Sequence, residues 1–187
     1  MEGTDYIEKL FPRLNDIKDD ELKNKVALLW LKAWKTSRYE KIEDLSQWEA
    51  EREKINISNV DHTNQVVECA LAAAEVVERA QKVSVDRDVL IAASILHDVD
   101  KILMFDPSNG ESTPEGKYLP HSGLGSGMVM NAGLPLAVAH AVAAHSPNYS
   151  AVKPKTPEAV IVAAADHLMT TVWNVSRNVE ISFAVKH

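Results

Sequence analysis

Six residues of this sequence carry side chains that bind divalent metals and stand at positions where such side chains are unusual. Asp166 interrupts the apolar run AVIVAAADHL, where a buried carboxylate is costly unless it is paired, hydrogen-bonded or coordinated. Imidazole and carboxylate ligands together suit ions of borderline hardness such as Fe, Mn, Co, Ni or Zn. A multi-cysteine site is excluded because Cys69 is the only cysteine. The sequence therefore predicts a metal centre built from His62, His97, Asp98, His121, His145 and Asp166.

The dipeptide His97-Asp98 lies at the end of an apolar segment, LIAASILHDVDK, directly before a stretch rich in turn residues. Adjacent residues of a regular helix point about 100° apart, so both side chains reach one ion only where the helix loosens. The end of a helix provides that freedom. A His-Asp pair alone is commonplace, and a lone histidine is more often a hydrogen-bonded structural residue. The pair therefore gains meaning only together with the other four residues.

Apolar residues at helical spacing predict that these residues lie on helices, and the fold class is all-α. Ser58 or Asn59 can cap the helix that bears His62. Thr156 and the first-turn residue Pro157 open the helix that contains Asp166. The expected helices span residues 20–35, about 60–81, 87 to about 97, 121–131 and 135 to about 145, and a last one starts at 157.

Two segments interrupt this helical pattern. Residues 105–120, FDPSNGESTPEGKYLP, predict an exposed loop of the length that often forms a lid. The polar stretch 44–54 predicts a short helix followed by a linker. A chain of 187 residues without repeats is expected to form one structural domain, in which an N-terminal helical extension (1–57) packs on a metal-binding region (58–187).

The ordered motifs DHT (61–63), LHDVDK (96–101), PHSGLGSG (120–127), AHSP (144–147) and AADHL (164–168) resemble those of the HD superfamily of metal-dependent phosphohydrolases. The resemblance covers about residues 58–176 and is to the subset with two extra histidines between the His-Asp pair and the final aspartate. It implies a bundle of about five helices that binds two metals. By this resemblance, His62, His97, Asp98 and Asp166 surround one ion, His121 and His145 bind the other, and Asp98 bridges both.

Two cations about 3.5 to 4 Å apart can activate a water at neutral pH and neutralise charge on a substrate oxygen. Asp98 and Lys101 are the predicted catalytic residues, since Lys101 lies one turn beyond Asp98 and can contact a substrate anion or leaving group. Arg177 follows Asp166 by eleven residues on nearly the same helical face and is a second predicted substrate contact. The alternative for both cations is a solvated surface role.

Three functions are compatible with this pattern. The first is hydrolysis of a small phosphorylated or anionic metabolite, a phosphomonoester or nucleotide, by a hydroxide activated between two metals. The second keeps the ligands but makes the protein a mixed-valent diiron oxygenase. The third is a nucleotide-binding module with a vestigial site, against which the complete set of buried carboxylates argues.

Charge and hydropathy exclude some partners. The chain has 20 basic and 27 acidic residues, a formal charge of -7, and no stripe of Lys and Arg that would bind duplex nucleic acid. No apolar run approaches the roughly 20 residues of a membrane span. The N-terminus MEGTDYIEKLF lacks the features of a secretory signal, so a cytoplasmic location is expected. A homodimer is left open.

Overall fold

The computed structural model describes residues 3–49, 56–146 and 150–178, and the predicted all-α fold is confirmed. In these ranges, extended pairing is limited to two isolated bridges, Ser46 with Ser58 and Phe105 with Ser112. Two 3-10 turns, η1 (Pro12–Asp16) and η2 (Ile42–Asp44), lie near the N-terminus. The α-helices are α1 (Thr4–Leu10), α2 (Asp20–Thr36), α3 (Asn59–Gln81), α4 (Arg87–Leu96), α5 (Lys101–Met104), α6 (Pro114–Tyr118), α7 (His121–Asn131), α8 (Leu136–Ala144) and α9 (Pro157–Ser176).

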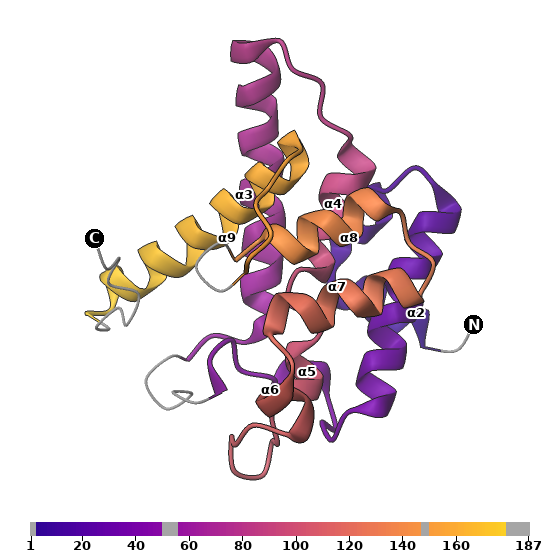
Figure 1. Ribbon diagram of the computed structural model, residues 1–187, viewed down its shortest axis with the longest axis vertical. Coiled ribbons are helices and arrows are strands. Elements are labelled where there is room, and N and C mark those ends of the chain that lie inside the picture. Colours follow the sequence, from indigo (N-terminus) through magenta and orange to yellow (C-terminus); the bar gives the residue numbers. More distant parts are fainter. Residues whose placement is uncertain (1–2, 50–55, 147–149, 179–187) are drawn as a thin grey trace.

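Helix α4 is the central element of the fold (Figure 1). It contacts α2, α3, α8 and α9, and every residue from Val89 to Leu96 is buried. The sequence VLIAASIL explains this position, because a helix that is apolar on all sides is stable only when other elements surround it. The C-terminal end of α4 therefore delivers the next residues, His97 and Asp98, into the interior.

The N-terminal helices pack directly on this centre. Trp30 of α2 is fully buried, its ring centroid lies 5.0 Å from that of Phe11, and its Nε1 donates to the carbonyl of Ile95 at 3.0 Å. One hydrophobic cluster runs from Ile7 to Ala165 and includes side chains from both sides of residue 58. The N-terminal extension therefore shares its core with the rest of the chain, and the boundary at 57/58 stays a prediction.

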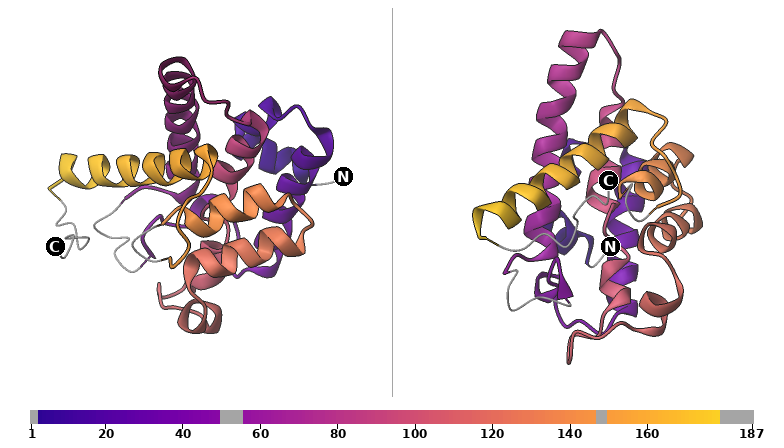
Figure 2. Two further views of the ribbon diagram at one scale, coloured as in Figure 1. Left: turned by 45° about the horizontal axis from the view of Figure 1, so that its top comes forward. Right: turned by 60° about the vertical axis from the view of Figure 1, so that its left-hand side comes forward.

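The two longest helices, α3 and α9, pack against each other, and one end of each projects beyond the other helices (Figures 1 and 2). Their predicted N-caps are confirmed. The Ser58 side chain accepts from the backbone N–H of Asp61, and the Thr156 side chain accepts from that of Ala159. These caps fix where each helix begins, and thereby the depth at which His62 lies.

The prediction that residues 105–120 form an exposed loop is wrong in part, because the segment contains α6. Thr113 caps this helix, and its hydroxyl also donates to the carbonyl of Leu103 at 2.7 Å. Pro114 occupies the first turn, so Thr-Pro is the same helix-start signal that opens α9, here masked by the neighbouring turn residues. A Cβ on Gly116 would overlap the carbonyl oxygen of Met104, which shows how closely α6 packs on α5.

Of the polar stretch 44–54, η2 ends at Asp44, Leu45 and Ser46 are extended, Gln47 and Trp48 form a turn, and Glu49 is 3-10 helical. Residues 50–54 lie outside the described ranges, so the predicted short helix stays a prediction. The backbone N–H of Gln47 donates to the carbonyl of Ile57 at 3.0 Å, and that of Asn59 donates to Leu45 at 2.8 Å. These bonds hold Gln47 and Trp48 beside the start of α3.

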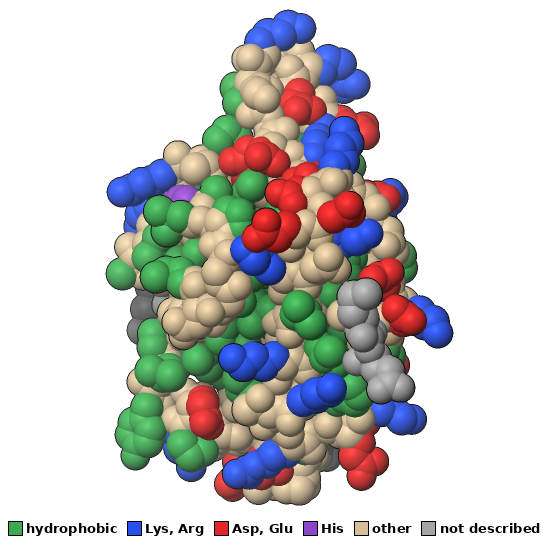
Figure 3. All heavy atoms as spheres, turned by 90° about the vertical axis from the view of Figure 1, so that its right-hand side faces the viewer, with side chains coloured by type: hydrophobic (Ala, Val, Ile, Leu, Met, Phe, Trp, Pro, Cys, Tyr) green, Lys and Arg blue, Asp and Glu red, His purple; other side chains and the backbone are tan. Residues whose placement is uncertain are grey.

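No helix in the described part of the chain is long and apolar enough to cross a bilayer. The face in Figure 3, on the side of the N-terminal helices, carries acidic and basic side chains interspersed with apolar ones. That face offers no continuous basic surface, in keeping with the formal charge of -7.

Candidate metal centre

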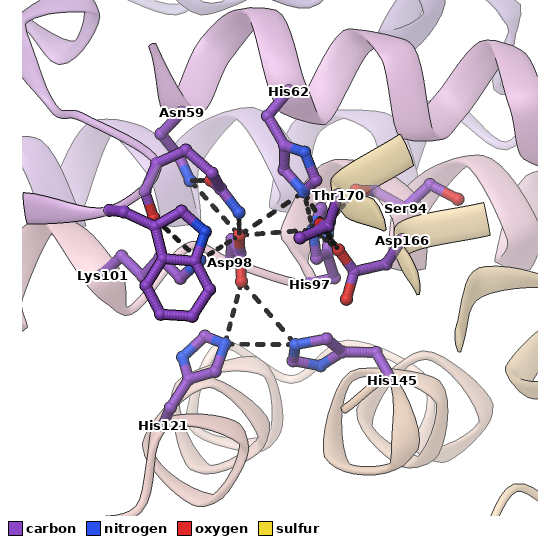
Figure 4. A network of polar contacts seen from close by, with 12 residues as sticks. Asn59, His62, Ser94, His97, Asp98, Lys101, His121, His145, Asp166 and Thr170 are labelled. Carbon is purple, nitrogen blue, oxygen red and sulfur yellow. Dashed lines mark hydrogen bonds and ion pairs between the residues drawn. The ribbon is translucent and has the colours of Figure 1, made fainter. Parts of the chain in front are cut away.

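The six predicted ligands come together although they are spread over more than a hundred positions (Figure 4). They come from the first turn of α3, the end of α4, the start of α7, the end of α8 and the middle of α9. Five of them form two groups of three that share Asp98, and within each group the ligand atoms lie within 4.8 Å of one another; Asp166 is in neither group. The His62 group is His62, His97 and Asp98, and the His121 group is Asp98, His121 and His145.

In the His62 group, the two imidazole Nε2 atoms lie 3.3 Å apart. Oδ2 of Asp98 is 3.4 Å from His97 Nε2 and 3.9 Å from His62 Nε2. Asp166 lies on the other side of both rings, with Oδ1 at 3.1 Å from His62 Nε2 and 3.9 Å from His97 Nε2. Two imidazoles are thus enclosed between two carboxylates.

In the His121 group, the same aspartate uses its other oxygen. Oδ1 of Asp98 lies 2.8 Å from His121 Nε2 and 3.6 Å from His145 Nε2, and the two imidazole nitrogens are 3.1 Å apart. Asp98 is therefore common to both groups, with one oxygen directed to each (Figure 4). Its side chain is 2% exposed.

Hydrogen bonds on the far nitrogens fix the imidazole orientations. Nδ1 of His97 bonds to the carbonyl of Ser94 at 2.7 Å, and Nδ1 of His145 bonds to the carbonyl of Val142 at 2.6 Å. A carbonyl only accepts, so Nδ1 carries the proton in both rings. When these rings are neutral, the lone pair is on Nε2 and points into the site, which is the tautomer a metal requires.

This arrangement fits divalent cations. Ligands at about 2.0 to 2.2 Å from one ion in tetrahedral or octahedral geometry are about 3.0 to 3.5 Å apart. The spacings within both groups, 2.8 to 3.9 Å, bracket that range. Inward-facing imidazole nitrogens this close together repel one another unless a proton or a cation lies between them. The donor set of imidazole and carboxylate suits transition metals of borderline hardness.

The electrostatics also favour bound cations. Burial and the charges of His121 and His97 lower the pKa of His145 to about 3, and burial lowers the pKa of His62. Burial opposes ionisation of Asp98, but Lys101 and the surrounding imidazoles hold the pKa of this carboxyl well below its usual value. His62 and His145 are therefore neutral beside an ionised carboxylate, the protonation states needed for metal binding. Burial also lowers the pKa of His97, but the charges of Asp98 and Asp166 and a hydrogen bond to Asp98 outweigh burial and raise this pKa.

His121 behaves differently from His145. Burial lowers its pKa, but the charges of Asp100 and Asp98 and hydrogen bonds to both outweigh burial and raise the pKa to about 10. Nδ1 of His121 bonds to Oδ2 of Asp100 at 2.9 Å. A metal at this group must therefore displace a proton from His121, while Asp100 continues to orient the ring.

Lys101, predicted to contact the substrate, lies next to Asp98. Its Nζ is 2.7 Å from Oδ2 of Asp98 and donates to the carbonyl of Gln47 at 3.4 Å. The ammonium also lies 5.7 Å from the ring centroid of Trp48. In the absence of a metal, Lys101 supplies the positive charge nearest to this oxygen.

Sequence reasoning missed three buried polar residues of the site. The side-chain amide of Gln47 donates to Oδ2 of Asp98 at 2.9 Å, and that of Asn59 donates to Oε1 of Gln47 at 3.0 Å and to the same carboxylate at 3.4 Å. Asp100, the third, is fully buried. A second carboxylate within LHDVDK was a usable signal for Asp100, whereas nothing in the polar stretch around Gln47 marked it.

Arg177 lies farther from the centre. It is exposed, and its guanidinium carbon is 4.0 Å from the ring centroid of Trp173. Among the described residues, its side chain contacts Trp173 and Ser176 rather than the six predicted ligands. His167 is exposed, and the ring of His140 accepts from the backbone N–H of Lys155. Among the described residues, neither is in the two ligand groups, and their exclusion from the ligand set stays a prediction.

The family model described as HD domain matches residues 59–171. The chain belongs to the HD-domain family. This HD protein is also 30% identical, over 173 residues, to the "Dihydroneopterin 2',3'-cyclic phosphate phosphodiesterase" of Methanocaldococcus jannaschii, an alignment that covers 86% of this chain and 67% of the relative. No solved structure matches it. The prediction of a metal-dependent phosphohydrolase of the HD superfamily is confirmed, as is the expectation that its His and Asp residues are positioned for divalent metals.

Proposed function

We propose that this HD protein hydrolyses a phosphoester of a small metabolite at two divalent metals, and that a cyclic phosphodiester is the preferred substrate class. The observation that carries the proposal is the position of Asp98, whose two oxygens face two separate pairs of imidazoles. A carboxylate directed to two groups of ligands is the feature expected of a dinuclear site.

The choice of a cyclic phosphodiester is supported by the M. jannaschii relative, whose name gives a cyclic phosphate as its substrate. The same name favours hydrolysis over oxygenation. The intact buried ligand set argues against a vestigial site, because a chain without metal gains nothing from keeping Asp98 and Asp166 buried beside four imidazoles.

When bound, the two cations would activate a water and neutralise charge on the phosphoryl oxygens. The chain's own residues have separate tasks. His62, His97 and Asp166 would hold one cation, His121 and His145 would hold the other, and Asp98, which faces both groups, would contribute to each. Gln47 and Asn59 keep the Asp98 carboxylate in place through their amide groups.

Lys101 is the proposed phosphate contact. With the charge of Asp98 compensated by cations, the ammonium of Lys101 would no longer have to neutralise that carboxylate. It could then donate to a phosphoryl oxygen or to the leaving group. Its side chain is 14% exposed, so it lies at the border between the site and solvent. Arg177 remains a proposed contact for a more distant part of the substrate, next to Trp173.

The test combines metal analysis with a substrate panel. Protein purified without chelator should contain about two equivalents of transition metal and hydrolyse 2',3'-cyclic nucleotides after loading with Mn, Fe, Co, Ni or Zn. Asp98→Asn should abolish both the metal content and the activity. The control variant Val172→Ala, on the exposed side of α9, should leave both unchanged.

Two outcomes would contradict the proposal. Activity that persists in metal-free protein would exclude metal-dependent hydrolysis. A mixed-valent diiron EPR signal with substrate-dependent consumption of O2, and no release of phosphate or of a phosphomonoester, would support the oxygenase instead.

A further inference from the structure

Asp166 is the more exposed of the two carboxylates that flank His62. Its side chain is 18% exposed, whereas those of His62 and Asp98 are each 2% exposed. Oδ1 of Asp166 lies 3.1 Å from Nε2 of His62, but Asp166 falls outside both compact ligand groups. Burial therefore restrains this carboxylate less than it restrains Asp98, and a hydrogen bond is needed to keep it directed at the imidazoles.

Most of the other predicted ligands are fixed by hydrogen-bonding groups outside the ligand set. These groups are Gln47 for Asp98, Asp100 for His121, and the carbonyls of Ser94 and Val142 for His97 and His145. Among the described residues, the one side chain outside the set that bonds to Asp166 is Thr170. Its hydroxyl donates to Oδ1 at 3.3 Å (Figure 4).

The bond joins two residues of α9 that are four positions apart and therefore on the same face, one turn from each other. A threonine hydroxyl within a helix commonly donates to the backbone carbonyl four residues earlier. Thr36 of α2 does so, to the carbonyl of Lys32 at 2.8 Å. Thr170 instead uses its proton on the side chain of the residue four positions earlier. A carboxylate oxygen has two lone pairs, so Oδ1 can accept this proton and still bind a cation.

We propose that Thr170 is a positioning residue of the metal centre, whose hydroxyl holds Asp166 in the orientation that reaches the cation of the His62 group. The inference rests on the proposed function, because it requires a cation at that group. Thr170 then acts on the metal through Asp166 and takes no part in bond cleavage. Groups that orient metal ligands in this way typically change metal affinity about 10 to 100-fold when they are removed.

The experiment measures Co²⁺ binding by calorimetry in the His145→Ala background, in which the His121 group lacks a ligand and the His62 group is intact. Thr170→Val keeps the shape of the side chain and removes its hydroxyl. We expect Co²⁺ to bind about tenfold more weakly, at the lower end of the range, because 3.3 Å is longer than the usual distance for a hydroxyl donor. Thr170→Ser, which keeps the hydroxyl, should restore the affinity.

Two controls separate this effect from a general loss of structure. Thr171→Val makes the same chemical change one residue further along α9, about 100° around the helix, and should leave Co²⁺ affinity unchanged. In the Asp166→Asn background, whose metal is expected at the His121 group, Thr170→Val should also have no effect. Helical circular dichroism checks that each variant folds, and Thr170→Ala replaces Thr170→Val if the valine variant does not.

The outcomes distinguish this inference from the proposed function. Unchanged Co²⁺ affinity in Thr170→Val, or a loss that Thr170→Ser does not restore, would overturn the role of the hydroxyl and leave the proposed function intact. An equal loss in the Asp166→Asn background would assign the effect to packing and would also overturn it. A loss restored by serine, in a protein that hydrolyses no phosphoester, would support the inference and refute the proposed function. Absence of Co²⁺ binding by wild type would overturn both.

Discussion

Replacement of Asp98 by asparagine tests the central feature of the site, because this substitution removes the charge and keeps the shape. In the metal-free protein, Asp98 compensates Lys101 at 2.7 Å and His121 at 2.8 Å. Removing one partner of a buried ion pair costs about 3 to 5 kcal/mol. Lys101 retains some solvent contact, so we expect a loss near the lower end, about 3 kcal/mol of unfolding free energy in urea.

The effect on metal content should be larger than the effect on stability. Asp98 is the one residue present in both ligand groups, so Asp98→Asn should reduce the bound metal from about two equivalents to nearly none. His145→Ala removes a ligand of the His121 group only, and Asp166→Asn removes a neighbour of the His62 group only. Each of these controls should keep about one equivalent, measured by mass spectrometry of the elements after gel filtration.

The reasoning would be refuted if Asp98→Asn retained the same metal content as either control. That result would mean that the two groups do not share the carboxylate in solution. The contribution of the charge is measured by comparing the unfolding free energies of Asp98→Asn and wild type at several salt concentrations. Because salt screens a buried ion pair only weakly, the difference between the two free energies should shrink only slightly as salt is added.

Three further predictions concern protonation, orientation and packing. Metal-free protein should be most stable near pH 6.5. Below this pH, the unfolded chain takes up protons that buried His62 and His145 exclude. Above it, the folded chain alone keeps the protons on His121, whose pKa is about 10, and on His97, whose pKa is also raised. On each side of this maximum, the free energy of unfolding in urea should change by about 1.4 kcal/mol per pH unit and per histidine. A free energy of unfolding that does not change with pH would contradict the pKa directions. Asp100→Asn should weaken metal binding at the His121 group about 10 to 100-fold in calorimetry while the His62 group is unaffected, since only His121 bonds to Asp100. Gly116→Ala should lower stability by about 1 to 3 kcal/mol, because a methyl would overlap the backbone of Met104, whereas Gly127→Ala, with open space around it, should be close to neutral.

The sequence predicts well those parts of the fold that depend on local signals. Helix α4 is apolar on all sides, and it lies at the centre. The caps Ser58, Asp86 and Thr156 start their helices where the capping rule expects. The composition of residues 105–120 wrongly predicts a loop throughout, because turn residues outnumber Thr113 and Pro114, the two residues that start α6.

The six predicted ligands could be singled out from the sequence because each is a polar side chain in apolar surroundings or at a helix end, and their role as ligands stays a prediction. Gln47 could not be singled out, because a glutamine in a polar stretch is ordinary. Its position beside Asp98 depends on the backbone bridge between Ser46 and Ser58. That pairing joins residues a dozen positions apart through backbone bonds, for which no side-chain pattern exists. The sequence marks Asn59 only as a helix cap, whereas its amide points inward to Asp98.

The contribution of residues 45–48 implies that the metal centre extends beyond the part of the chain that matches the HD domain. The family match begins at residue 59, yet Oδ2 of Asp98 receives its amide bond from Gln47, and Lys101 lies against the backbone of Gln47 and the ring of Trp48. The imidazoles of His97 and His145 are positioned from within the bundle, by carbonyls of α4 and α8. The shared carboxylate is instead held by the segment that precedes α3, through Gln47 and its contact with Lys101. Changes in this segment should therefore alter the surroundings of Asp98 while the imidazoles of His97 and His145 keep their orientation.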